Sequence, residues 1–106
     1  IQKRSKAFKE RRDFVVKSLN NIKGIKCLTP NGAFYVFPSC KGLLNKKTKF
    51  KTDTDFVKKL LEKENVAVVQ GSAFGLDGYF RISYATSMKN LKKAMDRIKS
   101  FCENLI

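Results

Sequence analysis

The chain has 106 residues, 42% of them hydrophobic, and a formal net charge of +14 at pH 7. This length fits one domain with one core, and the apolar content argues against a disordered chain. No apolar run approaches the roughly 20 residues that a membrane span needs, and segment 1–14 lacks the apolar centre of a signal peptide. The first residue, Ile1, is not Met, so we expect a fragment of a longer protein.

The excess of positive charge first suggests nucleic acid or another anionic surface as a partner. Lysines are spread along the whole chain, mostly where predicted helices would face solvent. We therefore favour solvated helix surfaces over a nucleic-acid interface. The chain has no His, and its three cysteines form no Cys-x-x-Cys pair. We expect no metal site, and reduced thiols in a cytoplasmic protein.

A helix is predicted over residues 1–22, where apolar side chains recur at helical spacing and charged ones cover the other face. Gly24 supplies a stop. The repeating apolar residues are Phe8, Val15, Leu19 and Ile22. A short strand is then expected at 25–28, and a turn at 29–32, where the sequence reads TPNG.

The segment AFYVF, residues 33–37, is dense in aromatic and β-branched side chains and predicts a strand. The basic stretch 40–51 is expected to be a surface loop. A second helix is predicted to begin at Thr52, because Thr52 can cap it and Asp55 stands where a capping box places its acid, and Asn65 would end it. Its predicted apolar stripe consists of Phe56, Val57, Leu60 and Leu61.

A short strand is predicted at 66–69, a Gly-rich connection at 70–78 and a longer strand, YFRISYA, at 79–85. Ser87 is a candidate cap for a last helix. The apolar face of that helix is expected to hold Leu91, Ala94, Met95, Ile98, Cys102 and Leu105.

The predicted order is helix, strand, strand, helix, strand, strand, helix. The loops inside each strand pair are too short for a parallel crossover, so the sheet should be antiparallel. We predict an α+β fold: a two-layer domain with a small antiparallel sheet, helices packed on one face, and a long N-terminal helix before it.

Side chains of the strand 79–85 alternate between its two faces. One face carries Phe80, Ile82 and Tyr84, and the other carries Arg81, Ser83 and Ala85. The apolar set must face the helices, so Arg81 should project from the helix-free side, between small residues that leave room for a ligand. A guanidinium stays charged and offers a planar fork of donors that matches a carboxylate. On the residues alone, an ordinary solvated arginine is the simpler interpretation.

Three motifs change that balance. PNGAFYVF at 30–37, VAVVQGSAFG at 66–75 and FRISYATS at 80–87 resemble, in order and spacing, motifs of the class I pyridoxal-phosphate (PLP) aminotransferases of fold type I. The resemblance is greatest to the bacterial aspartate and aspartate/prephenate aminotransferases. It implies that residues 1–106 are the C-terminal small domain of such an enzyme, without the large PLP-binding domain.

The resemblance also implies roles. Arg81 matches the arginine that holds the α-carboxylate of the substrate, and Phe74 matches the aromatic residue that lines the substrate pocket. Gly71 and Gly75 would let the loop turn and approach the substrate closely. Gln70 stands where the family usually has Pro, which loosens the loop.

Other motif residues, Gly32, Phe34 and Tyr35, are expected to have a structural role, as a turn glycine and as sheet packing. The resemblance places the PLP-binding lysine and the other cofactor contacts in the large domain, and their signature is not found in this sequence. We therefore expect no catalytic residue in this chain, which should be inactive alone. The expected parent is a homodimer that transfers an amino group from an amino acid to a 2-oxo acid, with the large domain as this chain's partner.

Two alternatives remain on the sequence. NGAFYVF superficially resembles the strand motif of RNA-recognition domains, but such domains do not begin with a long helix, and Asn31 replaces their basic residue. A non-catalytic interaction domain is the second alternative. We expect no membrane partner.

Overall fold

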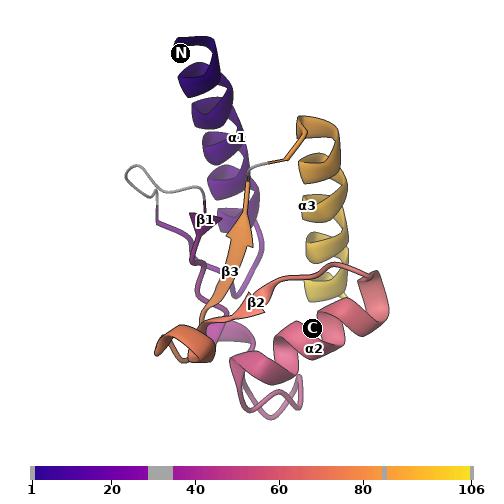
Figure 1. The fold of residues 1–106 in the computed structure, drawn as a ribbon. Coiled ribbons are helices and arrows are strands. Elements are labelled where there is room, and N and C mark those ends of the chain that lie inside the picture. Colours follow the sequence, from indigo (N-terminus) through magenta and orange to yellow (C-terminus); the bar gives the residue numbers. More distant parts are fainter. Residues whose placement is uncertain (1, 29–34, 85, 106) are drawn as a thin grey trace.

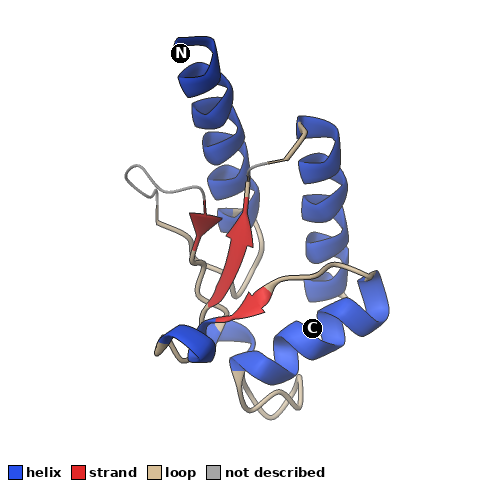
Figure 2. Ribbon diagram, in the orientation of Figure 1, coloured by secondary structure: helices blue, strands red, loops and turns tan. Residues whose placement is uncertain are grey.

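The computed structural model describes residues 2–28, 35–84 and 86–105 (Figure 1). The elements in chain order are α1 (Gln2–Asn20), β1 (Tyr35–Val36), the 3-10 helix η1 (Lys41–Leu43), α2 (Asp53–Glu64), β2 (Val69–Gln70), the 3-10 helix η2 (Gly71–Phe74), β3 (Phe80–Ser83) and α3 (Met88–Glu103). Figure 2 separates the helices from the short strands by colour. No helix in the described part combines the length and the apolar character needed to cross a membrane.

The sheet has the order β1-β3-β2, and both neighbouring pairs are antiparallel. The α-helices gather on one side of it, where α3 packs against both α1 and α2 (Figure 1). The predicted α+β class, with a small antiparallel sheet and a long helix before it, is confirmed.

The core lies between the sheet and the helices. Phe80, at 0% exposure, points from β3 into it, and its ring centroid lies 5.1 Å from that of Phe56 on α2. Phe56 in turn contacts Phe101 of α3, with 5.8 Å between the centroids. The other described side chains that were predicted to face inward from the strand at 79–85 and from the helix at 1–22 are buried as well: Ile82, Tyr84, Val15, Leu19 and Ile22. The side chain of Phe8 lies outside the described part.

Local sequence explains the bounds of α2. The Thr52 hydroxyl accepts a hydrogen bond from the Asp55 N–H, and the Asp55 carboxylate accepts from the Thr52 N–H, so the predicted capping box is present. A further bond from the Lys51 N–H, at 3.0 Å, reaches the same carboxylate. These N–H groups stabilise the ionised form and lower the pKa of Asp55 from its usual 3.8. Asn65 ends the helix in the left-handed region, at φ 56°.

Several predicted elements differ from the structure. The strand expected at 25–28 is reduced to one bridge, from Lys26 to Ser39, and the strand expected at 66–69 starts only at Val69. Within the expected surface loop 40–51, η1 forms and the side chains of Leu43 and Phe50 are buried. Leu61, expected in the stripe of α2, is 48% exposed, whereas Phe101, which was not expected, completes the buried face of α3. The turn 29–32, the strand start at 33–34 and Ala85 lie outside the described residues.

Candidate functional site

Arg81 lies in the middle of β3, opposite Val69 on β2. Its neighbours in sequence, Phe80 and Ile82, are buried against the helices, so Arg81 projects from the helix-free side, as the alternation predicted. Ser83, on the same face, is exposed. This placement puts a permanent positive charge where a ligand can reach it.

The guanidinium of Arg81 lies over two aromatic rings. Its carbon Cζ is 4.6 Å from the centroid of Tyr35 and 4.7 Å from that of Phe74. Both distances are within the range of a cation–π interaction. No carboxylate among the described residues forms an ion pair with Arg81. Two aromatic faces therefore hold the guanidinium, and no described acid neutralises its charge.

Phe74 reaches Arg81 from η2, which follows β2 directly. The Gly71 N–H donates a hydrogen bond to the Tyr79 carbonyl at 2.7 Å, and the Gly71 carbonyl accepts one from Leu76 at 2.8 Å. A Cβ on Gly71 would collide with the carbonyl oxygens of Leu76 and Tyr79, which explains glycine there. Gly75 ends η2 with φ +77°, a conformation that L residues rarely adopt. Both glycines shape the segment that presents Phe74.

Two further contacts hold η2 in place. The carboxylate of Asp53, at 2% exposure, accepts a 2.7 Å hydrogen bond from the Ser72 N–H. The hydroxyls of Thr54 and Ser72 are 3.3 Å apart. Asp53 is also the first residue of α2, so one helix start anchors the loop that carries Phe74.

Sequence reasoning gave Tyr35 only a structural role and assigned no role near Arg81 to Phe37 or Asp53. Phe37 meets Phe74 edge-to-face, with 6.0 Å between the ring centroids. The two-residue period of AFYVF could have placed Tyr35 and Phe37 on one face, together with Arg81 across the sheet. No comparable signal marks Asp53, because its contact with Ser72 joins residues that are 19 positions apart.

All three cysteines are free and buried. Burial raises the pKa of the Cys27 thiol to about 11 and those of Cys40 and Cys102 to about 12. The negative charge of Asp53 adds to the effect on Cys40. A thiol with so high a pKa is a poor nucleophile at neutral pH, because the thiolate is the reactive form.

The described residues do not form a site that fits PLP. Lysines whose side chains are described lie exposed at the surface, apart from Lys59, which is partly buried beside Glu62 at 3.9 Å. Nor does any group of three or more described His, Cys, Asp or Glu side chains come together as for a metal ion.

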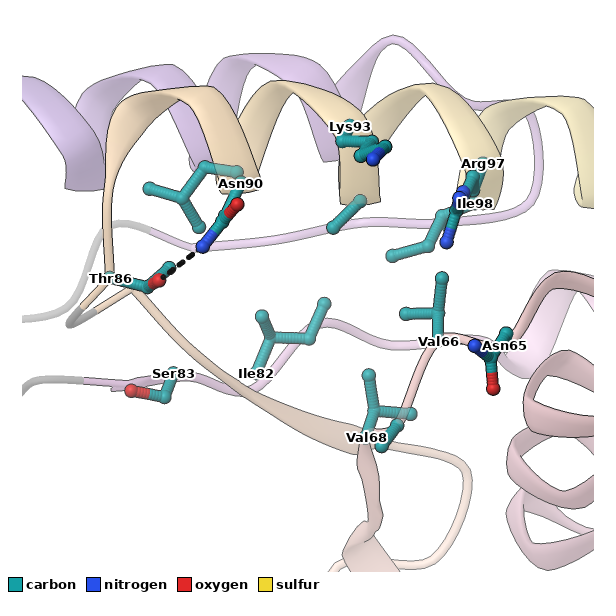
Figure 3. Close-up of a pocket in the computed structure, with 13 residues that line it drawn as sticks. Asn65, Val66, Val68, Ile82, Ser83, Thr86, Asn90, Lys93, Arg97 and Ile98 are labelled. Atoms are coloured by element: carbon teal, nitrogen blue, oxygen red, sulfur yellow. Dashed lines mark hydrogen bonds between the residues drawn. The ribbon is translucent and has the colours of Figure 1, made fainter.

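A separate hollow of about 350 Å³ lies between α3, β3 and the segment 65–68 (Figure 3). Its lining includes the apolar side chains of Val66, Val68 and Ile82, with Arg97 from α3, which donates to the Glu64 carbonyl at 3.5 Å. Neither Arg81 nor either of its two aromatic partners lines this hollow. It is thus distinct from the carboxylate-binding candidate.

Comparison with known proteins gives consistent results. The family model "Aminotransferase class I and II" matches residues 1–98. A probable aspartate/prephenate aminotransferase of Rhizobium leguminosarum bv. phaseoli is 57% identical over 106 aligned residues, covering 96% of this chain and 26% of the relative. An aspartate aminotransferase of Rhizobium meliloti is 52% identical and is covered to 27%. The chain thus spans about a quarter of the length of these curated relatives.

Solved structures agree. The crystal structure of the Rhizobium meliloti aspartate aminotransferase has a TM-score of 0.93 and 53% identity, over 96% of this chain and 26% of that one. An alanine aminotransferase from Pyrococcus furiosus has a TM-score of 0.88 and 37% identity, over 97% and 25%. These matches and the element order, which starts with α1, leave the RNA-binding alternative without support.

Proposed function

The chain belongs to the class I and II aminotransferase family, and on that premise we propose that it is the C-terminal small domain of a PLP-dependent aminotransferase of the aspartate type, with Arg81 as the anchor for the substrate's α-carboxylate. One observation carries the proposal: Arg81 projects from the helix-free face of the sheet, over Tyr35 and Phe74 and without a described acidic partner.

The role of this chain is to bind and orient the substrate. The planar fork of Arg81 receives both oxygens of a carboxylate, which fixes the direction of the bonds at the neighbouring Cα. Phe74 and Tyr35 cover part of the guanidinium and exclude water from it, which strengthens the charge interaction. PLP, when bound, supplies the electron sink for cleavage at Cα.

The rest of the reaction belongs to the remainder of the polypeptide. We propose that the large domain holds PLP, that amino acids and 2-oxo acids are the substrates, and that the parent is a homodimer. Several relatives are named for aspartate or for aspartate and prephenate, which favours a dicarboxylic substrate. A cytoplasmic location stays a prediction.

Replacement of Arg81 in the full-length protein tests the proposal. We expect Arg81→Ala to lose about 2–5 kcal/mol in kcat/KM for aspartate, the scale for breaking a desolvated charge pair. Arg81→Lys should recover only part of it, because an ammonium group has no fork. Arg97→Ala, which removes a guanidinium from the separate hollow beside α3, is the matched control. It should have the same kcat/KM as the unsubstituted full-length protein. Unchanged kinetics in both Arg81 variants would remove Arg81 from the site.

A further inference from the structure

We infer that Tyr35 is a positioning residue for this site: its ring holds the guanidinium of Arg81 in the orientation that receives the carboxylate. This inference rests on the proposed function and extends it to a residue that the motif alone marks as structural. The juxtaposition that carries it is the 4.6 Å between the Cζ of Arg81 and the ring of Tyr35.

Tyr35 comes from a strand whose place is fixed. Val36, its neighbour in β1, is 1% exposed and pairs with Ile82 of β3. The same register sets Tyr35 opposite Ser83, a residue with a small side chain. Arg81 lies diagonally across from Tyr35 on the same face, a separation that an aromatic and a long side chain can bridge. The sheet itself therefore delivers the ring to the guanidinium.

An aromatic ring suits this task better than an acid. A free arginine side chain has several rotatable bonds, and ordering it during binding costs conformational entropy. A carboxylate could order it in advance, but would compete with the substrate for the same fork. A ring attracts the cation through its quadrupole and leaves the N–H donors unpaired. Arg81 has such rings as partners and no ion pair with a described acid, so it is ordered while its charge stays available.

Tyr35 and Phe74 differ in how firmly they are held. Phe74 belongs to η2, a Gly-rich segment, and is 47% exposed. Tyr35, at 39% exposure, belongs to a strand paired with the one that carries Arg81. The ring of Tyr35 thus moves with Arg81, whereas the ring of Phe74 depends on the loop. We therefore assign the orientation of Arg81 mainly to Tyr35.

Steady-state kinetics of Tyr35→Leu, Tyr35→Met and Tyr35→Phe in the full-length, PLP-loaded protein test the inference. With aspartate, Leu and Met should each lower kcat/KM by about threefold to thirtyfold, the range of one cation–π contact, chiefly through a higher KM. Phe keeps the ring and should restore kcat/KM to within about twofold of the parent. Tyr79→Leu, which removes a ring that lies 5.0 Å from the Lys41 ammonium, is the matched control and should leave KM unchanged.

A double-mutant cycle separates positioning from mere packing. Combined with Arg81→Ala, Tyr35→Leu should cause almost no additional loss, because the group that it positions is already gone. The inference is wrong if the losses from Tyr35→Leu and Arg81→Ala are fully additive, or if the Leu and Met variants have the kinetics of the unsubstituted protein. In either case, a loss caused by Arg81→Ala alone would still support the proposed function. No effect of Arg81→Ala would refute both.

Discussion

At the scale of single residues, Asp53 is a buried acid that holds the segment carrying Phe74. Its carboxylate is 2% exposed and accepts the Ser72 N–H at 2.7 Å. It also lies in the first turn of α2, where the helix dipole favours a negative charge. Both interactions compensate for its burial, and the hydrogen bond connects α2 with the segment that presents Phe74.

Removal of this carboxylate should destabilise the chain. We expect Asp53→Ala to lower the free energy of unfolding by about 1–3 kcal/mol, because the Ser72 N–H loses its acceptor. Asp53→Asn keeps an acceptor oxygen and should lose less. The measurement is urea unfolding followed by circular dichroism, with Asp96→Ala, an exposed acid on α3, as the control. Equal losses for Asp53→Ala and Asp96→Ala would contradict the role given to the Ser72 contact.

At the scale of elements, the start of α2 gives the stability a dependence on acid pH. The Lys51 and Thr52 N–H groups lower the pKa of Asp55 in the folded chain. The Asp55 carboxylate therefore binds a proton more readily in the unfolded chain than in the folded one. Its ionised form stabilises the folded chain above the usual pKa of 3.8, and this stabilisation is lost as the pH falls through the lower pKa of the folded state.

Asp55→Asn should abolish this contribution. Urea unfolding of the parent and the variant, measured between pH 7 and pH 2, should show the largest difference near neutral pH and a shrinking one below about pH 4. Asp77→Asn, in the exposed connection after η2, is the control for an acid outside the capping box. A difference that stays constant over this range would show that the Asp55 charge does not stabilise α2.

The same elements show how far sequence alone leads. The bounds of α2 and α3 follow from local chemistry, since Thr52, Asn65 and Ser87 cap them through nearby backbone groups. Strand ends depend on partners distant in sequence, so β2 covers only Val69–Gln70 although the apolar run predicted a strand at 66–69. Alternation along β3 was sufficient to place Arg81. The contact between Tyr35 and Arg81 also depends on the register of β1 against β3, and the local sequence pattern does not predict that register.

At the scale of the whole molecule, the proposed function divides substrate binding and cofactor chemistry between two parts of the protein. Arg81, the proposed carboxylate anchor, lies on the helix-free face of the sheet, whereas the lysines with described side chains lie at the surface, exposed or, for Lys59, partly buried. The chain spans about a quarter of its relatives' length. We therefore assign to it the positioning of substrate and to the remainder the cofactor chemistry.

This division predicts that the 106-residue chain is inactive by itself. Incubated with PLP, aspartate and 2-oxoglutarate, it should form oxaloacetate no faster than free PLP does, because a base held beside the cofactor is required for proton transfer at Cα. The full-length protein under the same conditions is the positive control. Enzyme-like turnover by the chain alone would show that one of its own lysines serves the cofactor.

The three concealed sulfur atoms have a practical consequence for spectroscopy. With thiol pKa values of about 11 to 12 and at most 5% exposure, Cys27, Cys40 and Cys102 are protected from maleimide and nitroxide reagents near neutral pH. A single cysteine introduced at Leu28, which is 90% exposed, would therefore take up a probe selectively. The three cysteines of this chain therefore need no replacement before fluorescence or spin labelling at an introduced cysteine.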